Sequence, residues 1–189
     1  MNDNDFIKAS NVFSQVEMMK PLIRACDWDA LERQAEARCR EHAGESDTRS
    51  IASILLQPYE QALGSSLSLA VSKARASDAK AIYFEFDMED GWRSWLFICP
   101  HYPQRWDRLL GSDYLEELDG PRMPNLASIY GELQIFAPVP RETCMTSYLV
   151  ARTFACFGRA SQPFAGLGVA MGMAFHDQDE IIRVHDDAA

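Results

Sequence analysis

The amino-acid sequence predicts an α+β fold in which N-terminal helices precede an antiparallel sheet of hairpins packed by helices. Residues 1–78 show apolar side chains at helical spacing and no strand pattern. Residues 80–100 contain two strand-like runs around a turn dipeptide, and residues 166–175 alternate strictly between small and large side chains. Because each recognisable pair of neighbouring strands has the form of a hairpin, we expect an antiparallel sheet.

Helical segments account for the first part of the chain. The first is expected over residues 5–19, the second begins near Asp27 or Asp29, and the third covers residues 46–76. Stops or kinks are expected at the residues that interrupt helices, namely Pro21, Gly44 and Pro58.

The remainder, residues 79–189, is expected to form the sheet region and to make one compact domain with the helical residues 1–78. Between the two hairpins the pattern predicts five further elements: short helices over residues 105–110 and 113–118, a helical turn over residues 125–130, a strand over residues 132–137 and a helix over residues 142–157.

The first hairpin is expected to turn at Asp90-Gly91, a dipeptide that accepts positive φ at both positions of a two-residue loop. That loop fixes the register and predicts one apolar face with two aromatic pairs, Phe86 opposite Trp95 and Phe84 opposite Phe97. The other face would then carry Glu85 and Asp87, with Trp92 beside the turn. An exposed Trp92 suits a binding hot spot, and capping of the hairpin by its ring is the structural alternative.

The second hairpin is expected to use residues 166–175 as its first strand and Gln178-Asp179 as its loop. This register sets Phe175 opposite Ile182 and Met173 opposite Val184. Its small face would allow another element to approach closely. His176 and His185 would lie on opposite faces, which argues against a shared metal site.

The negative charge is concentrated in two segments. The chain carries a formal net charge of −10, of which residues 81–120 hold −6 and residues 176–189 hold −4. Such a field repels nucleic acid and anionic membranes, and it attracts a basic partner. Solubility alone is the competing explanation.

The five cysteines include no C-x-x-C pair, which favours free thiols in a reducing cytoplasm over a disulfide framework. The first residues lack the basic region of a secretory signal, and the longest apolar run, residues 164–175, is too short to span a bilayer. No phosphate loop, dinucleotide fingerprint, nucleophile elbow or zinc-helix motif is present, so no cofactor and no metal are expected.

In size, acidity and lack of catalytic motifs, the chain resembles the cytosolic immunity proteins that bacteria pair with secreted toxins. The resemblance implies a non-catalytic protein that blocks a basic toxin through an acidic surface. We expect that surface to comprise eight residues: Glu85, Asp87, Trp92, Glu116, Glu117, Asp177, Asp179 and Glu180.

Two alternatives remain open. The order of strands and helices is similar to that of class I secretion chaperones, which implies a chaperone for a secreted effector, although this chain has additional N-terminal helices. The other alternative is a small enzyme in which Glu85 and Asp87, two apart on one strand, act as acid and base.

Overall fold

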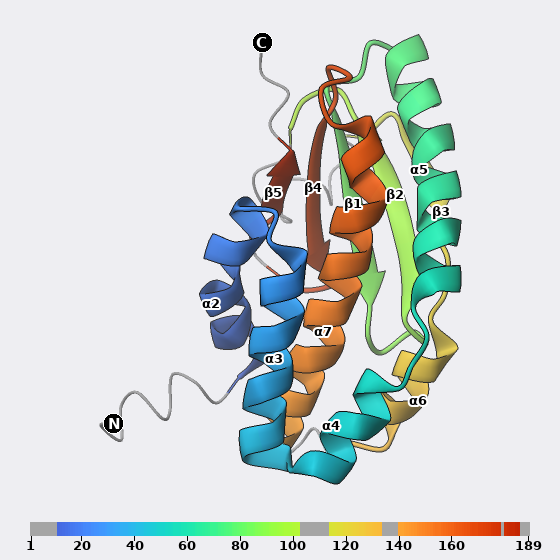
Figure 1. Ribbon diagram of the computed structural model, residues 1–189. Coiled ribbons are helices and arrows are strands. Elements are labelled where there is room, and N and C mark those ends of the chain that lie inside the picture. Colours follow the sequence, from blue (N-terminus) through green and yellow to red (C-terminus); the bar gives the residue numbers. More distant parts are fainter. Residues whose placement is uncertain (1–10, 103–113, 134–139, 179, 186–189) are drawn as a thin grey trace. The chain divides into compact units, whose positions relative to one another are not determined.

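The computed structural model describes residues 11–102, 114–133, 140–178 and 180–185, and it confirms the α+β class (Figure 1). Helices precede a five-stranded sheet with the strand order β3-β2-β1-β4-β5. The chain divides into two compact units, residues 1–55 with 124–155 and residues 56–123 with 156–189. The expected boundary between residues 78 and 79 falls inside the second unit.

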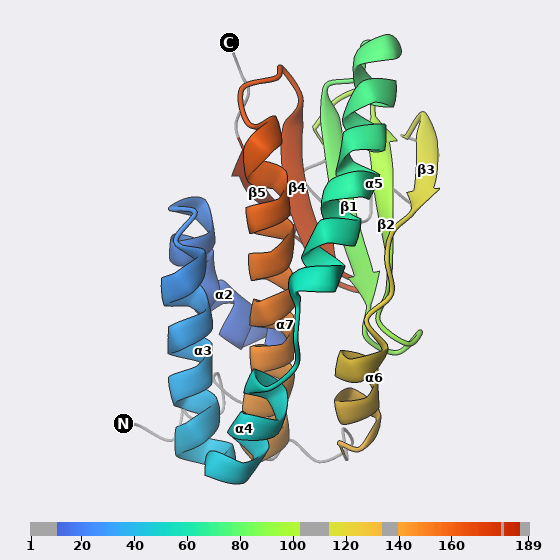
Figure 2. The same cartoon turned by 45° about the vertical axis from the view of Figure 1, so that its right-hand side comes forward.

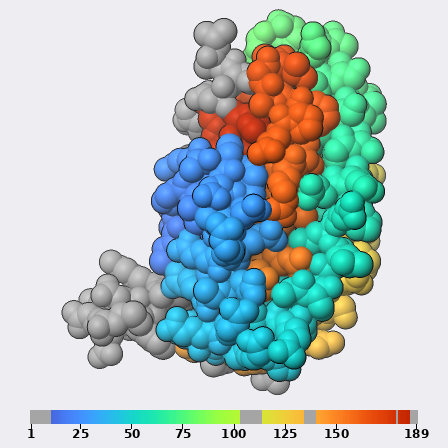
Figure 3. Space-filling model, viewed as in Figure 1, coloured from blue at the N-terminus to red at the C-terminus, as the bar shows by residue number. Residues whose placement is uncertain are grey.

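The first unit is helical. It contains α2 (Val12–Arg24), α3 (Trp28–Ala43), α4 (Glu45–Ala52), α6 (Pro124–Gly131) and the part of α7 (Pro140–Ser161) that precedes residue 156. The side chain of Asp27 accepts a hydrogen bond from the backbone N–H of Ala30, as expected for an N-cap. Gly44, at φ 89°, separates α3 from α4, and the side chains of α3 and α4 form a continuous surface in Figure 3.

A buried arginine ties α4 to its neighbours in this unit. Arg152, on α7, donates to the backbone carbonyl oxygens of Ile51 and Ile54, and it pairs with Glu32 at 3.4 Å. Ile51 lies in the last turn of α4, and Ile54 lies two residues beyond its end, where carbonyl oxygens have no helical donor. The guanidinium therefore closes that helix end, and Arg152 as a whole is only 8% exposed.

Two predicted helix ends are wrong. α2 passes through Pro21 and ends at Arg24, although a proline removes one helical hydrogen bond. The extension buries Ile23 completely, and this burial offsets the lost bond. α7 likewise runs through Gly158 to Ser161, because the residues of its last turns, including Phe157, are buried.

The second unit packs helices against one face of the sheet. Its elements in chain order are α5 (Gln57–Ala76), β1 (Ala81–Asp87), β2 (Arg93–Cys99), β3 (Glu116–Asp119), the last turns of α7, η2 (Gln162–Phe164), β4 (Ala170–Phe175) and β5 (Ile182–His185). Figure 2 shows α5 lying across β1 and β2. From the last turns of α7, Phe157 stacks on Phe84 with 4.6 Å between ring centroids.

The sheet is mixed rather than wholly antiparallel, because β1 pairs in parallel with β4. Phe84 lies opposite Met173, and Phe86 lies opposite Phe175. The sequence pattern shows hairpins, in which strands are neighbours in the chain. It does not show a pairing between strands separated by more than 80 residues. This parallel pair determines which residues meet at the candidate site.

The predicted register of the first hairpin is wrong by one residue. Phe84 lies opposite Leu96 and Phe86 opposite Ser94, so the residues between the strands form a five-residue loop. The Asp87 carboxylate accepts hydrogen bonds from the backbone N–H groups of Glu89, at 2.7 Å, and Asp90, at 3.2 Å, which ends β1 early.

The second reason for this register is Trp92. It adopts φ 55° and is fully buried, with its ring stacked 5.6 Å from Phe86. The helix-facing side of the hairpin therefore carries Phe84, Phe86 and Leu96. The opposite face carries Tyr83, stacked on Phe97 at 5.7 Å.

The second hairpin also differs from its prediction. β4 begins at Ala170 rather than Gly166, because Gly166 and Gly168 take positive φ in the preceding turn. Met173 lies opposite Ile182, with an irregularity between Met171 and Gly172, so the expected pairing with Val184 is wrong.

The region between the hairpins is only partly described. Residues 116–119 form the edge strand β3 instead of the end of a predicted helix, because their backbone pairs with β2. Glu132 and Leu133 follow α6 as a turn. The predicted helix over residues 105–110 and the rest of the predicted strand over residues 132–137 lie outside the described residues.

Candidate functional site

A buried carboxylate, Glu85, forms the centre of the candidate site in the second unit. It lies on β1, on the face of the sheet opposite α5, and it is 2% exposed. The Tyr83 hydroxyl donates to Oε2 of Glu85 at 2.9 Å, and Nδ1 of His176 lies 2.8 Å from Oε1. Both carboxylate oxygens therefore have a partner.

The parallel pairing of β1 with β4 brings His176 to Glu85. His176 directly follows β4, and its backbone N–H donates to the carbonyl oxygen of Phe86 at 2.8 Å. Its side chain is 42% exposed. A solvent-accessible imidazole is thus held by a carboxylate that is almost completely withdrawn from water.

Burial and hydrogen bonding act on this pair in opposite directions. Burial raises the pKa of the Glu85 carboxyl, while the hydrogen bonds from His176 and Tyr83 partly offset that effect. Burial lowers the pKa of His176, but the hydrogen bond and charge of Glu85 outweigh it, so the pKa is raised overall. Burial also raises the pKa of Tyr83 well above its usual value, so its hydroxyl stays protonated and donates.

The pair can hold and transfer a proton. A carboxylate that orients one imidazole nitrogen is the arrangement that prepares histidine for acid–base chemistry. Asp177 lies 3.8 Å from Nε2 of His176, and its charge, together with that of Asp87, favours the protonated ring. Among the described residues, no group of three His, Cys, Asp or Glu side chains could hold a metal ion.

The predicted exposure of Glu85 and Trp92 is wrong. The one-residue change of register places Trp95 and Phe97 of β2 on the face that carries Tyr83 and Glu85, so this face is apolar and buries the carboxylate. Trp92 folds into the helix-facing core. Neither side chain can contact a partner directly. The structural alternative for Trp92, in which its ring closes the hairpin, describes its position better.

Four carboxylates meet at one end of the sheet, which we call the acidic end: Asp87, Glu89, Asp90 and Asp177. Asp87 is the last residue of β1, Glu89 and Asp90 follow that strand, and Asp177 follows β4. Because β1 and β4 are parallel neighbours, the two acidic segments lie at the same end of the sheet. Glu89, Asp90 and Asp177 are exposed. Arg93, at the start of β2, pairs with Asp119 at 2.8 Å and lies 3.8 Å from Asp90.

The other predicted contact residues lie elsewhere or outside the described residues. Glu116 and Glu117, on β3, pair with residues of β2 away from the acidic end, and Glu116 forms an ion pair with Lys73 at 2.5 Å. Glu180 is exposed between β4 and β5. The placement of Asp179 is not described, so its predicted role stays a prediction.

A serine–histidine pair was not anticipated from the sequence. Oγ of Ser161, at the end of α7, lies 2.8 Å from Nε2 of His185 on β5. Ser161 has no exposed surface, and its hydroxyl is also 2.9 Å from the carbonyl oxygen of Gly158. The pair therefore joins a helix end to an edge strand, and no substrate can reach the hydroxyl. No short motif marks these residues, which are 24 positions apart.

The fold and site define an α+β protein with a mixed five-stranded sheet, an acidic end and, beside it, a buried glutamate paired with a partly exposed histidine. No protein-family model, no curated protein and no solved structure matches the chain. In the described part of the chain, no helix has the length and apolar character needed to cross a membrane.

Proposed function

We propose that the protein is a non-catalytic binding protein that recognises a basic protein partner through the acidic end of its sheet. The observation that supports this most is the parallel pairing of β1 and β4. Because of it, Asp87, Glu89 and Asp90 lie beside Asp177, so acids from both charged segments of the sequence present one surface. Solubility alone does not require them to gather.

The proposed class is an immunity protein that neutralises a toxin in the cytoplasm. The resemblance in size, acidity and lack of catalytic motifs favours this class. The second unit carries 16 acidic and 9 basic residues, a net charge of −7. Such a field accelerates encounter with a basic surface at low ionic strength and is screened over about 8–10 Å at physiological salt.

The experiment compares two sets of charge reversals. A photo-crosslinker at residue 89 identifies the partner in cells, and the same crosslinker at residue 41 serves as the control. Association is then measured with Glu89→Lys/Asp177→Lys and with Glu41→Lys/Glu132→Lys. Both double variants change the net charge equally, but Glu41 and Glu132 are exposed residues of the first unit.

The first double variant should slow association by about tenfold at low salt, and the control should change it by less than about twofold. Added salt should remove the difference. An acidic partner, or equal effects of both variants, would contradict the proposal. A toxin whose activity is blocked supports immunity, whereas a secreted effector that is bound without inhibition supports the chaperone alternative.

An enzyme remains the second candidate, and the Glu85–His176 pair is the observation that favours it. The 2.8 Å contact positions an imidazole that is partly open to solvent. In this case His176→Gln should abolish turnover of the substrate while leaving binding of a protein partner intact. If the protein only binds its partner, no turnover is detected. The charge reversals then weaken partner binding, and His176→Gln does not.

A further inference from the structure

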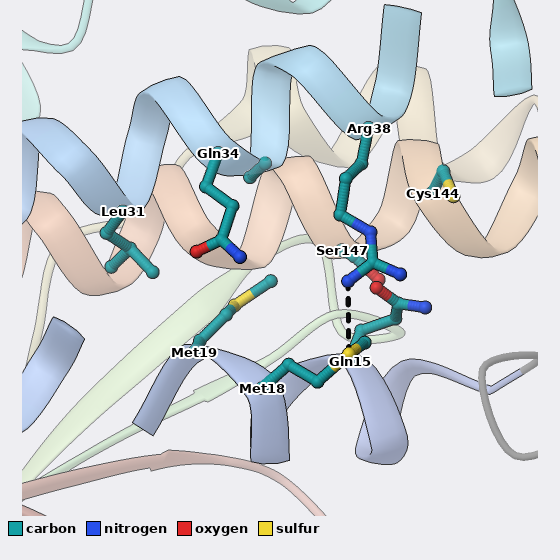
Figure 4. Close-up of a pocket in the computed structure, with 9 residues that line it drawn as sticks. Gln15, Met18, Met19, Leu31, Gln34, Arg38, Cys144 and Ser147 are labelled. Atoms are coloured by element: carbon teal, nitrogen blue, oxygen red, sulfur yellow. Dashed lines mark hydrogen bonds between the residues drawn. The ribbon is translucent and has the colours of Figure 1, made fainter. Parts of the chain in front are cut away.

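A small pocket in the first unit lies among α2, α3 and α7 and belongs to no site described above (Figure 4). Arg38 of α3 reaches toward α2, with its guanidinium beside the sulfur of Met18. Met19, Leu31 and Ala35 supply an apolar wall and are buried. The cavity measures about 10 Å³, which is room for roughly one water molecule.

The charged guanidinium of Arg38 contacts a weak hydrogen-bond acceptor, the sulfur of Met18. Its Nη1 lies 3.1 Å from Sδ of Met18, and among the described residues it has no carboxylate partner. A thioether is a weak acceptor, while the guanidinium fork matches the two oxygens of a carboxylate. Other arginines of this unit have such partners: Arg40 binds Glu36 at 2.6 Å, and Arg141 binds Asp47 at 2.7 Å.

The pocket lining does not neutralise Arg38. Burial raises the pKa of the Cys144 thiol to about 11, so this lining residue is uncharged near neutral pH. Ser147 uses its hydroxyl to donate to the carbonyl oxygen of Thr143 at 2.6 Å. Met18 is 39% exposed, and its unbranched side chain can move at low cost. Moving it aside would free the guanidinium nitrogen that its sulfur now contacts, next to the apolar side chains of the pocket.

We propose that this pocket binds the carboxyl-terminal residue of a partner polypeptide that ends in an apolar side chain. Such a residue carries a carboxylate and an apolar group on the same Cα, which matches Arg38 beside Met19 and Leu31. The small cavity accepts only the tip of a side chain, so a polypeptide must supply the remaining contact area outside it. The site is independent of the acidic end, which belongs to the other unit.

The test uses two matched probes, N-acetyl-leucine and N-acetyl-leucinamide, which differ only in the carboxylate. Binding to the full chain is followed through the ¹³C-methyl signals of its eight methionines, with Met18→Leu and Met19→Leu used for assignment. N-acetyl-leucine should shift the Met18 and Met19 signals in a saturable way. The amide should bind at least about fivefold more weakly, as expected for one lost charge-assisted contact.

Two substitutions on α3 provide the comparison. Arg38→Gln should abolish the preference for the acid over the amide. Arg33→Gln removes the same charge from an exposed position outside the pocket and should leave the preference unchanged. Equal binding of the two probes to the unmodified chain would overturn the proposal without reliance on any variant.

A third comparison tests the source of the carboxylate. A peptide that ends in a free leucine should bind more tightly than N-acetyl-leucine, while its amidated form should not. Octanoate that binds as tightly as the peptide would show that a free carboxylic acid is the ligand, and this would overturn the assignment to a polypeptide end. An equal loss of preference in Arg33→Gln would also overturn the assignment to Arg38.

Discussion

Glu85 is a carboxylate that the sheet buries and also supplies with partners. A buried carboxylate is strongly unfavourable unless it is hydrogen-bonded or neutralised. Tyr83 and His176 occupy both of its oxygens, at 2.9 and 2.8 Å. Protonation of Glu85 or His176 therefore changes the free energy of unfolding of the second unit, and the stability of this unit depends on pH.

The first prediction concerns this linkage. The folded-state pKa of His176 is raised above 6.5, so its contribution to stability is complete below that pH and is lost as pH rises through the folded pKa. The raised pKa of Glu85 changes stability in the same direction at lower pH: its contribution is complete below pH 4.5 and is lost as pH rises through the folded pKa. The free energy of unfolding, measured with urea, should therefore decrease between pH 6.5 and the raised folded pKa of His176.

His176→Gln should flatten this decrease, because it removes the titrating ring. Glu85→Gln should flatten it as well, because the amide carries no charge to favour the imidazolium. His42→Gln, on α3 in the other unit, is the control for the loss of one histidine. An unchanged pH dependence in His176→Gln would mean that the Glu85–His176 contact does not link protonation to folding.

Single residues also explain why the sequence misplaced part of the site. Asp90-Gly91 favours a two-residue turn, but the competing hydrogen bonds that the Asp87 carboxylate accepts from the backbone N–H groups of Glu89 and Asp90 are equally local. Burial of Trp92 decides between them, since a fully buried tryptophan contributes several kcal/mol. Local sequence patterns carry no information on how much the burial of Trp92 contributes. The sequence therefore predicted the hairpin but not its register.

The sequence pattern of β4 correctly predicted that the strand has two unlike faces, but not what packs against the small one. Its alternation of large and small residues predicted two unlike faces, and the strand has them. The large residues Met171, Met173 and Phe175 are fully or almost fully buried. On the small face, a Cβ added at Gly172 would lie 2.7 Å from both the hydroxyl oxygen of Tyr102 and a methyl carbon of Ile181. Side chains, rather than another backbone, fill that space.

The second prediction follows from this close approach. Gly172→Ala should destabilise the protein by about 1–3 kcal/mol, because the new methyl group displaces Tyr102 and Ile181. Gly64→Ala is the matched control, since its Cβ would meet nothing within 4 Å in the middle of α5. That change should stabilise the protein by about 0.5–1 kcal/mol. Urea denaturation gives both values, and equal signs would contradict the packing described for β4.

For the whole molecule, the class of fold was predictable, but the meeting point of the acidic segments was not. Helical spacing before residue 78 and two hairpins after it were enough for an α+β class. The parallel pair of β1 and β4 joins strands that are distant in the chain, and α7 lies between them in sequence. The contact of His176 with Glu85 depends on that pair, so local patterns alone could not reveal it.

The last prediction concerns the charge of the whole chain. If the acids of the second unit are retained for binding, they are not arranged for stability. Ion pairs such as Lys73–Glu116 and Arg93–Asp119 are partly exposed, and ion pairs exposed to water contribute little to stability. Repulsion within a unit of net charge −7 should exceed them at low salt.

Raising the salt concentration from about 20 to 300 mM at pH 8 should therefore increase the melting temperature, because screening weakens the repulsion over distances beyond about 10 Å. Glu89→Gln/Asp177→Asn should raise the melting temperature at low salt and should reduce its salt dependence. Scanning calorimetry at each salt concentration measures both effects. A melting temperature that falls with salt would mean that ion pairs dominate, and the acids would then form a stabilising network rather than a surface held ready for a basic partner.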